Sequence, residues 1–174
     1  MKQLALLRGI NVSGKKKIKM ADLRALLDQH GFTGVATYIQ SGNIVFAEKG
    51  APVEVARELR EIIRSHYGFD VPTMVFTAAE WLQFQRNNPF LVKGGVEEAH
   101  LHLTILAKAP SEILHPEVQT KDKCHLQGRV IYLHCPNGYG RTKLTNAFWE
   151  KVSGMEATTR NWKSVKKLAT LLVE

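Results

Sequence analysis

The order of apolar segments in the first 77 residues is the feature that most restricts the fold. Short apolar runs typical of strands alternate with stretches whose apolar residues recur at helical spacing, and a Ser-Gly-Asn turn joins two of the strands. The predicted strands are residues 4–7, 35–40, 44–47 and 72–77, and the predicted helices are residues 21–30 and 52–67. This βαββαβ order is typical of a ferredoxin-like unit, an antiparallel sheet with two helices on one face.

The second half of the chain repeats this plan in kind, without identity between individual residues. We expect strands at 101–106, 124–127, 130–135 and 157–160, a short helix that begins with residues 111–114, an amphipathic helix at 142–152 and a final helix from about residue 161. Thr77 and Glu80 have capping-box spacing and predict a connecting helix, and Gly94-Gly95 is the predicted linker. We therefore predict an α+β protein of two ferredoxin-like (βαββαβ-type) antiparallel-sheet units with extra connecting and C-terminal helices, in domains 1–94 and 95–174.

Composition excludes several classes of protein. The chain has 174 residues, 44% of them hydrophobic, which is too many for a disordered chain. No apolar run approaches the roughly 20 residues of a membrane span, and Arg8 interrupts the N-terminal apolar run before a signal sequence could form. Two cysteines argue against a disulfide scaffold and for a reducing compartment. The expected location is cytoplasmic, with no membrane partner.

The excess positive charge lies at the two ends of the chain. Residues 1–24 carry seven Lys or Arg and one acid, and residues 141–174 carry seven bases and three acids. The 116 residues between them have a net charge of −2, within a total of +8. If the fold brings the two ends together, they form a positive surface that attracts phosphates. Scattered, solvated lysines are the alternative interpretation.

The loop after the first strand resembles a phosphate-binding loop. Residues 9–16, Gly-Ile-Asn-Val-Ser-Gly-Lys-Lys, nearly match the Walker A pattern, but Lys16 stands where a magnesium-binding Ser or Thr is needed. A hairpin follows in place of a parallel crossover, so a different kind of anion-binding loop is the better interpretation, with charge from Lys15, Lys16 and Lys17. A solvated basic loop is the alternative.

Two predicted helix starts in the C-terminal segment place basic residues where a helix already carries partial positive charge. Arg141 and Lys143 surround the first, and Arg160, Asn161 and Lys163 surround the second. A basic side chain at a helix start destabilises the helix by a few tenths of a kcal/mol. A bound anion reverses this effect, because the free amides, the helix dipole and the basic side chain then all attract the anion. The alternative is that Thr142 and Asn161 are ordinary N-caps.

Other chemistries find little support. Cys124-His125 and His134-Cys135 place neighbours on opposite faces of strands, so they predict buried thiols and surface imidazoles instead of a metal site. No nucleophile elbow is present, and Ser41 has no identifiable base, so no catalytic residue is assigned. The predicted first strand has no aromatic residue and the third has only Phe46, which disfavours base stacking on the sheet. No cofactor and no particular oligomeric state are predicted.

Several of these segments together carry a family resemblance. They are Arg8-Gly9-Ile10-Asn11-Val12, Met20, Leu23, Tyr38-Ile39-Gln40-Ser41-Gly42-Asn43, Asn88-Pro89-Phe90, Gly140-Arg141-Thr142-Lys143, Thr159-Arg160-Asn161-Trp162, Val165 and Leu168. With these motifs the chain resembles the bacterial family catalogued as domain of unknown function 1697, with small departures at Ser13, where Gly is usual, and Ser164, where Thr is usual. The resemblance implies a two-part α+β protein and no established activity.

The functional hypothesis is a binding protein for a phosphate-bearing or other anionic ligand, such as a nucleotide. We expect the ligand in a basic cleft between the N-terminal loop and the two C-terminal helix starts. The candidate ligand-binding residues are Arg8, Asn11, Lys15, Lys16, Gln40, Ser41, Asn43, Arg141, Lys143, Arg160, Asn161 and Lys163. One alternative is an enzyme acting on a small phosphorylated or anionic metabolite, for which the sequence offers no supported general base. The other is non-specific nucleic-acid binding through charge.

Overall fold

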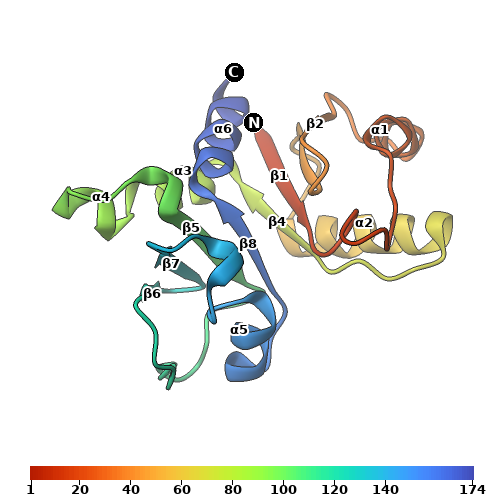
Figure 1. The fold of residues 1–174 in the computed structure, drawn as a ribbon. Helices are drawn as coiled ribbons and strands as arrows, with labels where there is room; N and C mark the ends of the chain where they lie inside the picture. The colour runs from red at the N-terminus through yellow and green to blue at the C-terminus, as the bar shows by residue number, and fades with distance from the viewer. The chain divides into compact units, whose positions relative to one another are not determined.

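A computed structural model describes residues 1–174, which divide into two compact units. Unit 1 comprises Met1–Gln83 and Leu168–Glu174, and unit 2 comprises Phe84–Lys167. Each unit contains a four-stranded antiparallel sheet with helices (Figure 1). This confirms the predicted α+β class with two ferredoxin-like units. The predicted domain boundary at residue 94 stays a prediction.

Unit 1 follows the βαββαβ order that the sequence predicts. Its elements are β1 (Lys2–Leu7), α1 (Met20–Gln29), β2 (Ala36–Tyr38), β3 (Asn43–Ala47), α2 (Pro52–Tyr67) and β4 (Thr73–Thr77), followed by the start of α3 (Ala78–Arg86). The strands are ordered β2-β3-β1-β4, with β1 antiparallel to both β3 and β4. The central position of β1 places the loop that follows it at one end of the sheet.

Local signals explain where the helices of unit 1 begin and end. Pro52 occupies the first turn of α2, where its missing amide costs nothing, and Gly68 ends the helix in the left-handed region at φ 78°. The predicted capping box opens α3. The Thr77 amide donates to Glu80 Oε2 at 2.9 Å, and the Glu80 amide donates to Thr77 Oγ1 at 3.2 Å.

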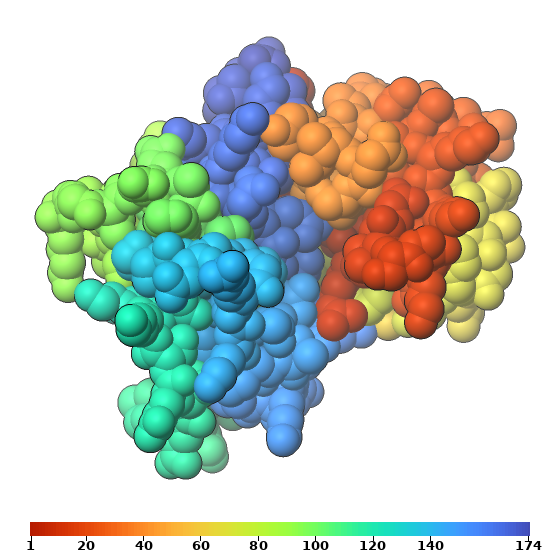
Figure 2. Space-filling model, viewed as in Figure 1, coloured from red at the N-terminus to blue at the C-terminus, as the bar shows by residue number.

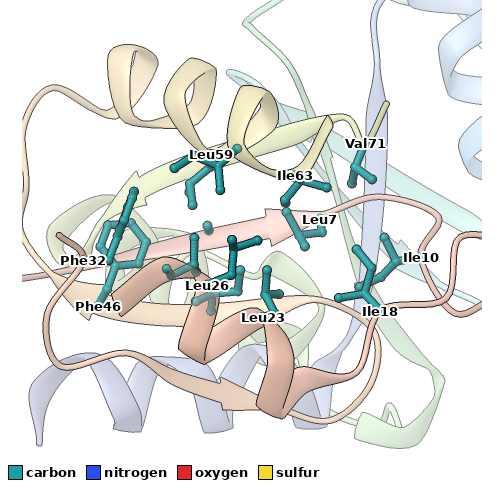
Figure 3. Packing of buried hydrophobic residues seen from close by; sticks show 14 of the residues in the cluster. Leu7, Ile10, Ile18, Leu23, Leu26, Phe32, Phe46, Leu59, Ile63 and Val71 are labelled. Carbon is teal, nitrogen blue, oxygen red and sulfur yellow. The ribbon is translucent and has the colours of Figure 1, made fainter. Parts of the chain in front are cut away.

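The core of unit 1 lies between the sheet and the two helices α1 and α2. Alternate strand residues, such as Leu7 and Phe46, point to the face that both helices cover (Figure 3). Leu23 of α1 and Leu59 of α2 are fully buried against them. Burial of each such side chain contributes about 1.5–3 kcal/mol, so the helical spacing read from the sequence is what attaches α1 and α2 to the sheet.

Unit 2 has the same strand order as unit 1. Its elements are the end of α3, α4 (Pro89–Lys93), η1 (Glu98–His100), β5 (Leu101–Leu106), β6 (Lys123–Gln127), β7 (Val130–His134), η2 (Tyr139–Arg141), α5 (Asn146–Ser153), β8 (Ala157–Asn161) and the start of α6 (Trp162–Val173). The sheet order is β6-β7-β5-β8, and all neighbours are antiparallel. Its core centres on Trp149 and Leu144, which pack against Leu133 and Ile131 of β7.

The structure corrects three local predictions in unit 2. No helix forms at residues 111–114, where Ile113 is 78% exposed and only Leu114 packs against the core of unit 2. The helix predicted from residue 142 begins at Asn146, because Thr145 Oγ1 accepts a hydrogen bond from the Phe148 amide and caps it there. A hairpin centred on Gln127-Gly128, as the sequence suggests, would place Cys124 opposite Ile131, but the β6–β7 turn spans only Gly128 and Arg129 and places Cys124 opposite Leu133.

None of the helices meets the length and apolarity that crossing a membrane would require.

Candidate functional site

The twelve candidate residues fall into two groups, seven in unit 1 and five in unit 2. Each group is described within its own unit. The expectation that both groups share one cleft stays a prediction.

In unit 1, the side chain of Asn11 fastens the loop that follows β1. Its Nδ2 donates to the Ile18 carbonyl at 3.0 Å and to the Gln40 carbonyl at 2.8 Å, and its Oδ1 accepts from the Ile18 amide at 2.9 Å. Asn11 itself has φ 55°, a left-handed conformation that asparagine tolerates better than most residues. Asn11 therefore shapes the loop, with both polar atoms of its side chain engaged by the protein.

The basic residues of this loop differ in their surroundings. Lys16 Nζ donates to the backbone carbonyl of Asp70 at 2.6 Å. The pKa of the Asp70 carboxyl is lowered mainly by its hydrogen bond from Arg60, and the charge of Lys16 contributes to the same shift. Lys15 is exposed to solvent, with only its backbone amide bonded, to the Val12 carbonyl. Arg8 is half-buried at the end of β1.

The turn between β2 and β3 holds three more candidates. Asn43 is fully buried, and its Nδ2 donates to the Tyr38 carbonyl and to Ser41 Oγ, both at 2.9 Å. This hydrogen bonding makes Asn43 and Ser41 structural residues of the turn. Gln40 is exposed, and no hydrogen bond holds its side-chain amide. Of the three, Gln40 is the residue whose side chain can reach a ligand.

A shallow groove of about 470 Å³ opens at the first turn of α1. It is lined by Lys19, Met20, Ala21, Arg24, Thr37, Ile39 and Gln40. Figure 2 shows the red and orange segments, which carry the loop, α1 and β2, as adjoining parts of the surface of unit 1. The groove therefore places the exposed Gln40 beside the start of a helix.

Two cations and no carboxylate line this groove. Arg24 donates to Thr37 Oγ1 at 2.6 Å, which holds the guanidinium across the groove, and Lys19 makes no ion pair. Lys19 is also the N-cap of α1, where no side chain caps the helix. The carboxylate in the first turn of α1, Asp22, does not line the groove. It lies near Tyr67, whose pKa is raised mainly by burial and to a smaller extent by the charge of Asp22.

Ile39 lines the same groove in an unusual conformation. Its φ is 51°, and positive φ is rare for a β-branched residue because the side chain then crowds the backbone. Such a conformation typically costs about 1–3 kcal/mol and persists only where the surrounding structure imposes it. The tight turn that closes at Gly42 imposes it here.

In unit 2, the segment around Arg141 and Lys143 precedes a helix and does not begin one. Arg141 lies in the short η2 and is exposed, while Lys143 Nζ donates to the Gln119 carbonyl at 3.3 Å. Thr142 donates to Asp122 Oδ2 at 2.5 Å and accepts from the Leu144 amide. The expected helix start at this segment is therefore wrong, since α5 begins at Asn146 with its own cap.

Arg160 lies within β8 and is 7% exposed. Its guanidinium donates to Thr158 Oγ1 at 2.8 Å and to the Thr159 carbonyl at 2.9 Å. Burial lowers the pKa of Arg160 to about 10, which leaves it protonated at neutral pH. Because strand residues alternate, Arg160 and Asn161 point to opposite faces of the sheet.

A second hollow, which we call the α6 pocket, lies at the start of α6 within unit 2. It has a volume of about 500 Å³ and is lined by Glu98, Ala99, His102, Asn161, Trp162, Lys163 and Lys166. Asn161 Oδ1 accepts from the Ser164 amide at 2.8 Å, which confirms Asn161 as the N-cap of the final helix. Asn161 and Lys163 are thus the two candidates that the structure brings together in one pocket of unit 2.

His102, which lines the α6 pocket, is not among the candidate residues selected from the sequence. His102 pairs with Asn161 across β5 and β8, so both side chains lie on the same face of the sheet. Its ring stacks on Tyr139 of η2, with ring centroids 4.7 Å apart. In unit 1, Lys19 was missed as well, although a lysine directly before a helix, in place of Ser, Thr, Asp or Asn, is a readable signal.

Two histidines, the buried His102 and the half-buried His134, make the stability of unit 2 depend on pH. Desolvation lowers the pKa of His102, and desolvation together with the nearby His100 lowers that of His134, from an ordinary value of 6.5. The unfolded chain then binds more protons, so stability is fully present above pH 6.5 and is lost as pH falls towards the folded-state values. We expect the free energy of unfolding, measured with urea, to fall between pH 7.5 and 5.5.

The matched variants separate this effect from that of the carboxylates. His102→Gln should show a smaller loss between the two pH values than the wild type, whereas His125→Gln, at an exposed position, should lose as much as the wild type. Equal losses in both variants would show that His102 does not contribute.

No group of three or more His, Cys, Asp or Glu side chains is arranged to hold a metal ion. Cys124 and Cys135 are both free thiols, and burial raises the pKa of each. Both thiols are therefore protonated at neutral pH.

The fold and these hollows define a tandem ferredoxin-like α+β protein whose surface hollows are lined with basic residues. The chain belongs to the family described as protein of unknown function (DUF1697), whose profile matches residues 1–132. The resemblance stated from the sequence motifs is thereby confirmed.

The fold is shared with a solved bacterial structure. The conserved bacterial protein SP0830 from Streptococcus pneumoniae superposes with a TM-score of 0.72 at 22% sequence identity, over 98% of each chain. At this identity the similarity supports the fold alone. No curated protein matches the chain.

Proposed function

We propose that this protein binds a small phosphate-bearing or other anionic ligand, and that the groove at the start of α1 receives the anionic group. The observation that carries the proposal is that Lys19 and Arg24 line this groove together with the uncapped first turn of α1, and no carboxylate does. Gln40 and Thr37 add neutral polar groups to the lining.

The electrostatics of the groove are unfavourable without a ligand and favourable with an anion. The first turn of a helix carries about half a positive charge, and the Lys19 ammonium adds to it. An anion in the groove would meet backbone amides, the helix dipole and two cations at once. A guanidinium also matches the geometry of phosphate or carboxylate oxygens, which favours Arg24 as the orienting contact.

The proposal predicts a large effect of neutralising Arg24. We expect Arg24→Gln to weaken the binding of inorganic pyrophosphate at least tenfold, which corresponds to about 1.4 kcal/mol, because a charged contact to the anion is lost. Lys19→Gln should weaken it less, since a lysine contributes charge without fixed geometry. Isothermal titration calorimetry at constant ionic strength measures both.

Arg57→Gln provides the control. Arg57 lies on the exposed surface of α2 and carries the same charge change, but it does not line the groove. Unchanged affinity in Arg57→Gln together with a loss in Arg24→Gln supports a defined site. Equal affinities in all variants, or equal losses in Arg57→Gln and Arg24→Gln, would overturn the proposal.

A further inference from the structure

Two residues that line the α6 pocket of unit 2, His102 and Trp162, each have a buried side-chain nitrogen without a hydrogen-bond partner. His102 is 8% exposed and Trp162 is 1% exposed, and both line the pocket. The Nδ1 atom of His102 and the Nε1 atom of Trp162 are buried and have no hydrogen-bond partner. An unsatisfied buried polar atom typically costs about 1–3 kcal/mol, so two around one pocket need a physical reason.

The surroundings of these two atoms favour a ligand with acceptor oxygens. The indole Nε1 can only donate a hydrogen bond, and a neutral imidazole donates from one of its two nitrogens. The backbone amides in the first turn of α6 have no acceptor within the helix. Of these, the Ser164 amide donates to the side chain of Asn161. His102 of β5 and Trp162 at the start of α6 therefore line the same hollow.

The charges around the pocket point the same way. Lys166 pairs with Glu98, so the carboxylate at the pocket is neutralised by a neighbour. Lys163 is exposed, makes no ion pair and lines the pocket beside the start of the helix. Lys163 therefore supplies positive charge that is not already committed to a carboxylate.

We propose that the α6 pocket is a second binding site, separate from the groove of unit 1, and that it takes a carboxylate or phosphate group of a small molecule. Lys163 supplies the charge, the first-turn amides of α6 meet the oxygens, and His102 gives a hydrogen bond from β5. The stacked ring of Tyr139 holds the imidazole in place. The volume of about 500 Å³ accommodates a small metabolite.

Nuclear magnetic resonance titration of the full chain tests the site, with sodium phosphate in one arm and sodium acetate in the other, at constant ionic strength. We expect saturable shifts of the backbone amides of residues 162–164 and of the Trp162 indole. The Trp149 indole, which is also buried without a partner but does not line the pocket, should stay unchanged. Saturation with phosphate alone assigns a phosphoryl ligand, and saturation with acetate alone assigns a carboxylate.

Variants at one helix face separate a site from general attraction to positive charge. Lys163→Gln should weaken the binding of the saturating probe at least fivefold. Lys167 is an exposed lysine of the same helix that does not line the pocket, and Lys167→Gln should leave the affinity unchanged. His102→Phe keeps an aromatic ring against Tyr139 and should also weaken binding. No saturable shift with either probe, or equal losses in Lys163→Gln and Lys167→Gln, would overturn the proposal.

The outcome is independent of the groove in unit 1. Shifts confined to residues 19–24 and 37–40 would support the proposed function and overturn the α6 pocket, and shifts confined to residues 162–164 would do the reverse.

Discussion

Gly42→Ala is expected to destabilise the protein by about 2–4 kcal/mol, enough to threaten folding of a domain of ordinary stability. Gly42 has φ 80°, and a β-carbon built there would lie 2.6 Å from Leu7 Cβ and 2.9 Å from Ile10 Cδ1. Leu7 Cβ is fixed by the backbone of the central strand β1, so no side-chain rotation relieves the contact. Urea unfolding measured by circular dichroism gives the free-energy difference.

Gly31→Ala is the matched control for this prediction. Gly31 has φ 78°, nearly the same as Gly42, but a β-carbon there meets no atom within 4 Å. Gly31→Ala should therefore destabilise the protein by only about 1–2 kcal/mol, the cost of holding alanine in the left-handed conformation. A cost for Gly42→Ala no larger than for Gly31→Ala would contradict the close approach of the turn to β1.

Asn11→Ala is expected to cost about 3–4 kcal/mol. The substitution removes three hydrogen bonds that tie the loop after β1 to Ile18 and Gln40, each with a net contribution of about 1 kcal/mol. It also places alanine at φ 55°, which adds about 1 kcal/mol. The same urea measurement tests this value.

Asn11→Gly separates the two contributions. Glycine loses the same hydrogen bonds but adopts positive φ without strain, so it should be more stable than Asn11→Ala by about 1 kcal/mol. Because Gln40 lines the α1 groove, both variants should also weaken pyrophosphate binding. Stability within 0.5 kcal/mol of the wild type, on the order of the effect of an ordinary surface substitution, would show that Asn11 does not hold the loop.

Much of the fold could be predicted from the sequence because its signals are local. Helical spacing of leucines, the Thr77–Glu80 capping box and the helix end at Gly68 each depend on residues within a few positions of one another. The predictions that failed lack such support. At residues 111–114 Ile113 is exposed and only Leu114 packs against the core, and at 142 a threonine competes with Thr145 as the cap.

The candidate site was harder to predict because the roles of polar residues depend on distant partners. Asn11 bonds to the Gln40 carbonyl, 29 residues away, and His102 meets Tyr139 across 37 positions. Sequence motifs selected Asn11, Asn43 and Arg160 as ligand contacts, and in the structure their polar atoms form hydrogen bonds within the protein. Burial decides between these roles, and no local pattern encodes it.

The sequence by itself determined the order of strands and helices, the family, and the concentration of positive charge near the two ends. Tertiary structure alone decided which basic groups stay accessible, because pairing and burial arise only when distant segments pack. The fold left Lys19 and Lys163 exposed at two helix starts. It also placed Arg160 and Asn161 on opposite faces of the sheet and paired His102 with Asn161, the N-cap of α6. Hydrogen-bond satisfaction and desolvation act on spatial neighbours, and those neighbours are fixed by the fold.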